Sequence, residues 1–119
     1  MDEAITLPAA VAMVPVARRA TGALLAGFER VDEAELIATE LVASAVRASA
    51  GEITVRVINV DVVRIEVTDQ RGRYPRDADI SRTDESAPDA LGLVSAVAEA
   101  MGSARRRSGE CTTWAELRP

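Results

Sequence analysis

The chain of 119 residues has neither lysine nor histidine, because all 14 of its basic side chains are arginine. Without histidine it cannot form a Ser-His-Asp triad, a Cys-His pair or a histidine-ligated metal site. Without lysine it has no Schiff-base residue and no Walker-type phosphate loop. The single cysteine, Cys111, excludes an internal disulfide and a cysteine-rich zinc site, so we expect a reducing compartment.

Aromatic residues make up only 3% of the chain, so the core must be built from alanine, valine, leucine and isoleucine. The length and the 48% hydrophobic content predict one domain that spans residues 1–119. The net charge of −5 argues against a nucleic-acid-binding surface. No apolar run can cross a bilayer, since Arg18 and Arg19 interrupt the one candidate. We therefore expect a soluble cytoplasmic protein that binds neither nucleic acid nor membranes.

The first half of the chain predicts one strand and two helices. Residues 4–8 are predicted to form a short edge strand, and apolar periodicity predicts a helix over residues 12–28. Asp32 is a good N-cap for the second helix, and Glu35 completes a capping box three residues later. This helix is expected to run to about Ser49. Its predicted apolar face consists of Ile37, Leu41, Ala45 and Ala48.

The second half predicts two hairpins separated by a polar segment and a helix. Residues 53–60 and 62–68 alternate and are rich in β-branched side chains, which is typical of a hairpin. Residues 70–88 have no apolar period, and a stretch of this length is either disordered or a functional lid.

A third helix is expected over residues 89–101, followed by a hairpin that turns at Ser108-Gly109 and returns through residues 111–117. This order of elements predicts an α+β fold. We expect a two-layer sandwich in which three helices cover one face of a mixed, mostly antiparallel sheet.

Three segments stand out for their order and spacing: Glu40–Arg47 on the second helix, Val67–Pro75 at the end of a strand, and Ala90–Val97 at the start of the third helix. With these segments the chain resembles the Bergerat-fold, histidine-kinase-like ATPases, and among them the anti-sigma regulatory factor kinases of actinobacteria. Residues 14–19 and 112–117 are also similar to that group, so the resemblance covers nearly the whole chain. It implies a Bergerat fold.

The resemblance also implies roles for individual residues. Glu40 would be the catalytic glutamate, and Ser44 stands where the family has the asparagine that holds Mg²⁺. A spacing of four places both on one helical face. Asp69 would accept a hydrogen bond from the adenine amino group, and Gly72 is the one evident glycine of those that let the backbone approach the base.

The third segment would hold phosphates at the entry of a helix through Ala90 and Gly92. Ala90 stands where a glycine belongs, and the acidic Asp89 precedes it. Together with Ser44, these departures predict that ATP and Mg²⁺ bind weakly or not at all.

Each of these residues also has an ordinary structural interpretation. Glu40 and Ser44 can belong to a solvated helix stripe, and an aspartate such as Asp69 often begins a turn. The arginines of the predicted lid can serve solubility alone, and Arg105–Arg107 can be one side of an exposed hairpin. The lid arginines are Arg71, Arg73, Arg76 and Arg82.

Two functions stay open at this point. The first is an anti-sigma-like regulator that controls transcription by partner switching, with weak or lost ATP binding. The second is an active serine/threonine kinase that phosphorylates an anti-anti-sigma antagonist with Mg-ATP. In both cases the resemblance implies a sigma factor or an anti-anti-sigma protein as partner, and a second copy of the chain in a homodimer.

Overall fold

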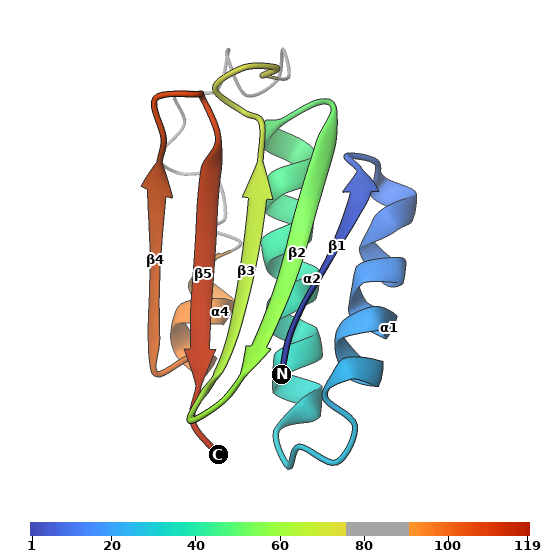
Figure 1. Cartoon of the computed structure of the whole chain (residues 1–119), viewed down its shortest axis with the longest axis vertical. Helices are drawn as coiled ribbons and strands as arrows, with labels where there is room; N and C mark the ends of the chain where they lie inside the picture. The colour runs from blue at the N-terminus through green and yellow to red at the C-terminus, as the bar shows by residue number, and fades with distance from the viewer. Residues whose placement is uncertain (76–90) are drawn as a thin grey trace.

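The computed structural model describes residues 1–75 and 91–119, in which five strands form one antiparallel sheet of order β1-β2-β3-β5-β4. The helices α1, α2 and α4 all lie on one face of this sheet (Figure 1). The predicted α+β architecture with helices on one face is confirmed, although every strand pair is antiparallel rather than mixed. The strands are β1 Asp2–Pro8, β2 Glu52–Asn59, β3 Val63–Asp69, β4 Ala100–Arg105 and β5 Cys111–Leu117. The helices are α1 Val14–Leu24, α2 Val31–Ala48 and α4 Leu91–Val97, and a 3-10 turn at Val11–Met13 precedes α1.

Strict alternation gives the sheet one buried and one open face. In β3 the side chains of Val63, Ile65 and Val67 are buried beneath the helices, whereas Arg64 and Glu66 face outward. The apolar stripe of α2 covers this inner face, and its predicted members are buried. The buried residues of α2 are Ala34, Ile37, Ala38, Leu41, Val42, Ala45, Val46 and Ala48.

The predicted edge strand and both predicted hairpins are confirmed. Among the described residues β1 pairs only with β2, and β2 joins β3 through a tight connection. The β4–β5 hairpin turns at Ser108-Gly109, where Gly109 has a φ of +95°. A side chain at that position would be strained, so the glycine suits the turn. None of the described helices is long and apolar enough to cross a membrane.

The predicted capping of α2 is wrong. The N-cap is Arg30 and no side chain caps the helix, because the backbone turn from Phe28 to Val31 already leads into the helical conformation. Asp32 therefore lies in the first turn, where its charge still favours the helix dipole. Glu35 does not complete a capping box and instead accepts a hydrogen bond from Arg18 of α1 at 3.3 Å.

The predicted ends of the other helices also need correction. α1 spans residues 14–24 rather than 12–28, because the chain leaves the helix in turns that include Gly27 at a φ of +91°. α4 ends at Val97 and not at Met101, which lies in β4 opposite Ala115. The strand pairing with β5 outweighs the helical period of Met101. Most of the predicted lid, and the predicted helix start at Asp89, fall outside the described residues.

Arg30 connects the start of α2 to the far end of the chain. Its guanidinium group donates to the Glu33 carboxylate at 3.0 and 2.9 Å and also to the Glu99 carboxylate. It further donates to the backbone oxygens of Val97 and Arg118, both at 3.1 Å. One side chain therefore joins α2, the α4–β4 connection and the C-terminal residues.

We expect the stabilising effect of Arg30 to depend on pH. Its hydrogen bonds lower the pKa of the Glu33 and Glu99 carboxyls below the usual value of about 4.5, and the Arg118 N–H adds to the effect on Glu99. A lowered folded-state pKa gives stability that is present above the unfolded pKa and is lost as pH falls through the folded pKa. In urea unfolding, Arg30→Met should therefore lose the most free energy of unfolding relative to wild type near neutral pH, and less in acid. An equal loss of stability at every pH would contradict this pH dependence. An equal loss in Arg19→Met, the control at an exposed site, would contradict the role of the Arg30 contacts.

Candidate functional site

The carboxylate of Asp69 is buried at the end of β3 and is held by a neighbouring arginine. Its side chain is 1% exposed, and Arg71 Nε lies 3.0 Å from each of its oxygens. Arg71 Nη2 donates to Oδ2 at 2.6 Å, and the Arg71 backbone N–H donates to Oδ1 at 2.8 Å. A buried carboxylate needs such a partner, because an isolated charge is strongly disfavoured away from water.

The turn over residues 70–75 folds back onto the end of α2. The N–H groups of Arg73 and Tyr74 both donate to the Gln70 oxygen, at 2.8 and 2.7 Å. The Tyr74 oxygen accepts from Ala50 N–H at 2.7 Å, and the Gln70 N–H lies 3.4 Å from Ser49 Oγ. The end of β3 and the end of α2 are thus fixed together, which places Asp69 on the helix-covered side of the sheet.

Gly72 makes a close contact with the other turn at this end of the sheet. Its N–H donates to the Gly109 oxygen at 2.9 Å, and a Cβ at position 72 would stand 2.5 Å from that oxygen. Because Gly72 has no side chain, the two turns can approach each other closely at this position.

Glu40 and Ser44 lie on one stripe of α2, and both are half-buried. Glu33 belongs to the same stripe and shares Arg30 with the Val97 oxygen, so this stripe faces the α4 side of the helix layer. Among the described residues, no hydrogen bond or ion pair engages the side chain of Glu40 or Ser44. No described contact joins either residue to Asp69.

The predicted phosphate-binding segment is described only in part. Gly92 is the second residue of α4, and the space where its Cβ would stand is open. Ala90 lies outside the described residues, as do Arg76 and Arg82. Gly92 therefore leaves room for the close approach of a ligand.

The described residues fit an adenine nucleotide poorly. At 1% exposure, the Asp69 carboxylate can meet an amino group only if Arg71 or another covering group moves. Magnesium favours carboxylate and amide oxygens in a near-octahedral arrangement, whereas α2 offers the shorter Ser44 hydroxyl beside Glu40. The part of the chain that the structure describes holds no group of three or more histidine, cysteine, aspartate or glutamate side chains placed to bind a metal.

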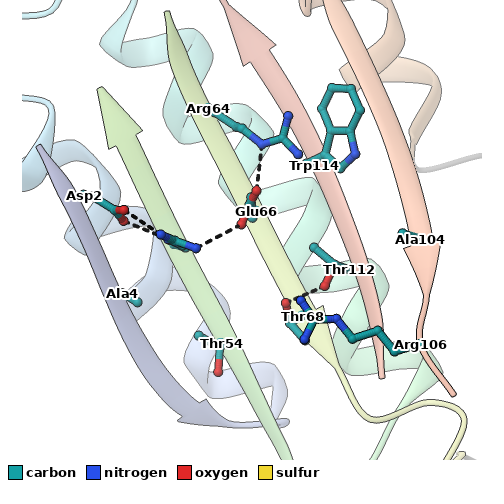
Figure 2. Close-up of a pocket in the computed structure, with 11 residues that line it drawn as sticks. Asp2, Ala4, Thr54, Arg64, Glu66, Thr68, Ala104, Arg106, Thr112 and Trp114 are labelled. Carbon is teal, nitrogen blue, oxygen red and sulfur yellow. Dashed lines mark hydrogen bonds and ion pairs between the residues drawn. The ribbon is translucent and has the colours of Figure 1, made fainter. Parts of the chain in front are cut away.

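The open face of the sheet carries a depression that the sequence analysis missed (Figure 2). Its volume is about 770 Å³, and Thr54, Thr68 and Thr112 line it together with charged side chains. The register places Thr6 of β1 beside Thr54, so threonines from four neighbouring strands form one row across the sheet. Strand alternation in the sequence identifies these threonines as outward-facing, but only the strand order brings them into one row.

The charges at this depression are largely paired with one another. Arg56 donates to both oxygens of Asp2, at 2.7 and 2.5 Å, and this lowers the pKa of the Asp2 carboxyl. Arg64 donates to Glu66 at 2.7 Å and also stacks 4.1 Å from the ring centre of Trp114.

Trp114 itself lies against β4. A Cβ on Gly102, its partner in the neighbouring strand, would stand 2.7 Å from its ring.

No protein-family model matches the chain, and no curated protein shows significant similarity to it.

The Asp69–Arg71 pair should be important for stability. Replacing Arg71 with methionine leaves a buried carboxylate without its guanidinium partner, and we expect a loss of about 3 kcal/mol in the free energy of unfolding. Urea denaturation measures this loss. The double variant Asp69→Asn/Arg71→Met should recover part of it, because the buried charge is then absent. Arg73→Met, at an exposed site in the same turn, is the matched control and should cost little. Equal losses in Arg71→Met and Arg73→Met would contradict the pairing.

Proposed function

We propose that the chain is a Bergerat-fold regulatory protein of the anti-sigma type, which controls transcription by exchanging protein partners and binds ATP weakly or not at all. The proposal is supported by the order of the three motif segments along the chain. It is also supported by the arrangement of one helix layer on a five-stranded sheet of order β1-β2-β3-β5-β4. In this interpretation the partners are a sigma factor and an anti-anti-sigma protein in the cytoplasm, and the regulator acts as a homodimer.

The observation that carries the proposal is that the Asp69 carboxylate is buried and already paired with Arg71. In the related kinases this position would bind the adenine amino group, but here its oxygens accept three contacts from the Arg71 side chain. The two residues are separated by a single position, so the pair forms locally as the chain leaves β3. A nucleotide base would have to displace a charge-assisted contact, which reduces its affinity.

Two further features support weak nucleotide binding. Gly72, which would let the backbone approach the base, instead contacts the hairpin through the Gly109 oxygen. Ser44 offers a hydroxyl where the kinases have an amide, and a hydroxyl reaches less far from the helix. Protein binding does not need these groups, so a partner-switching role is compatible with their loss.

The alternative is an active serine/threonine kinase that transfers phosphate from Mg-ATP to an anti-anti-sigma antagonist. Glu40 favours it, because the half-buried carboxylate has no hydrogen bond or ion pair among the described residues and shares its helix stripe with Ser44. Glu40 would then act as the general base on the attacking hydroxyl. The two functions share their partners and differ in nucleotide affinity.

Isothermal titration with Mg-ATP distinguishes them. We expect the wild-type chain to show no micromolar binding, because Asp69 is already engaged, and Asp69→Ala should leave the weak signal unchanged. The catalytic alternative has its own control in Glu40→Gln, which would keep nucleotide affinity while abolishing phosphate transfer. A micromolar dissociation constant that Asp69→Ala abolishes would overturn weak binding and favour the kinase.

The regulatory role has a separate test. Affinity capture from the native host, followed by identification of the bound proteins, should recover a sigma factor or an anti-anti-sigma protein. The core-disrupted variant Leu41→Asp serves as the control, since any protein that it captures equally well binds exposed apolar surface. Recovery of neither class by the folded chain would refute the role, whatever the nucleotide affinity.

A further inference from the structure

One end of the sheet gathers arginines from two turns that are far apart in the sequence. Arg73 belongs to the turn after β3, and Arg105, Arg106 and Arg107 belong to the β4–β5 hairpin. Both turns lie at the same end of the sheet (Figure 1). We call these four residues the basic tip.

Backbone contacts hold the two turns of the basic tip together. The Gly72 N–H donates to the Gly109 oxygen at 2.9 Å. A Cβ on Gly109 would lie 2.6 Å from Arg73 Cγ, so the stem of Arg73 packs directly on the hairpin. The hairpin is closed by a hydrogen bond from Arg106 N–H to the Glu110 oxygen at 2.8 Å. The cluster is therefore built by the fold rather than by sequence proximity alone.

The basic tip has positive charge that no carboxylate of the described residues neutralises. All four side chains are exposed, and none forms an ion pair with another described residue. This differs from the arginines elsewhere that do form ion pairs, namely Arg18, Arg30, Arg56, Arg64 and Arg71. These four positive charges add up at one end of the sheet, so a ligand of opposite charge is attracted to it.

We propose that the basic tip binds an acidic segment of a partner protein, a short run of aspartate and glutamate side chains. A guanidinium group binds a carboxylate through two parallel hydrogen bonds, which suits a chain whose only cations are arginines. The proposal concerns an interaction surface and holds whether or not the partner is a sigma factor.

The surroundings of the tip favour a short peptide over nucleic acid. Asp2, Glu66 and Glu116 lie along the open face of the sheet, and the chain as a whole carries a charge of −5. A nucleic acid presents phosphates at regular short intervals, and beyond the tip these would meet a face whose arginines, Arg56 and Arg64, are already paired with carboxylates. A short acidic segment needs only the tip itself.

The threonine row supplies hydroxyl groups next to the tip. Arg106 extends over the open face toward Thr68 and Thr112 (Figure 2). The two threonine hydroxyls lie 2.8 Å apart, so one donates to the other and the second hydroxyl hydrogen is left to donate to a ligand. A carboxylate beside Arg106 could therefore accept from both the guanidinium and a threonine hydroxyl.

Fluorescence anisotropy with a labelled glutamate-rich peptide tests the proposal. The glutamine counterpart of the peptide and a single-stranded oligonucleotide of equal charge are the comparison ligands. The wild-type chain should bind the acidic peptide, ignore the glutamine peptide, and bind less tightly as salt increases. The triple variant Arg105→Gln/Arg106→Gln/Arg107→Gln should weaken binding about tenfold.

A matched variant removes the same charge elsewhere. Arg19→Gln/Arg47→Gln/Arg118→Gln changes three exposed arginines that form no ion pair among the described residues, and it should bind nearly as tightly as wild type. Gly72→Val removes no charge but forces Arg73 away from the hairpin, so it should also weaken binding severalfold. Circular dichroism confirms that each variant is folded.

Three results would overturn the proposal. The first is no binding of the acidic peptide by the wild-type chain at low salt. The second is equal weakening by the two triple variants, which would make net charge and not the tip responsible. The third is tighter binding of the oligonucleotide than of the peptide, which would make the tip a nucleic-acid contact.

Discussion

The fold depends on the close approach of an alanine-rich helix to a sheet of branched side chains. Ala34, Ala38 and Ala45 of α2 are at most 1% exposed, and the side chains of β2 and β3 beneath them are equally buried. The fully buried cluster consists of alanine, valine, leucine and isoleucine, and the half-buried Phe28 packs against its edge. Such a core has little room for larger side chains. Both α1 and α4 pack against α2, and the helix layer therefore covers only one face of the sheet.

Arginine side chains also link both ends of α2 to other parts of the molecule. Near its start, Arg30 binds two carboxylates and two backbone oxygens. Near its end, Arg71 holds the Asp69 carboxylate in the turn that folds against Ser49. A guanidinium group has five N–H donors in one plane, which lets a single side chain join several acceptors. Arginine alone can therefore supply the ion pairs and hydrogen bonds that join distant elements of a chain without lysine.

Much of the fold could be predicted because its signals are local and periodic. Alternation in β2 and β3 and the apolar stripe of α2 each identify a buried face without knowledge of the partner. The two errors have different causes, the first a distant strand partner and the second a local turn. Met101 satisfies a helical period, but pairing with Ala115 places it in a strand. Asp32 has the chemistry of an N-cap, but the turn from Phe28 starts the helix earlier.

The candidate site was less predictable than the fold, because its contacts depend on turn geometry and on segments that are far apart in the sequence. Asp69 could be singled out from its place at the end of an apolar strand, but its ion pair with Arg71 depends on the turn geometry. The contact between Gly72 and Gly109 joins segments that no sequence pattern relates. The row of threonines across four strands requires the strand order, which no pattern in the sequence predicts.

The contact between Trp114 and Gly102 gives the molecule a built-in optical probe. Trp114 is the only tryptophan in the chain, and its ring packs closely against Gly102 with the Arg64 guanidinium stacked on it. Its indole emission therefore comes entirely from the open face of the sheet and is sensitive to the position of one cation. Any molecule that covers this face or draws Arg64 away would change the spectrum, without a label and without altering the helix layer.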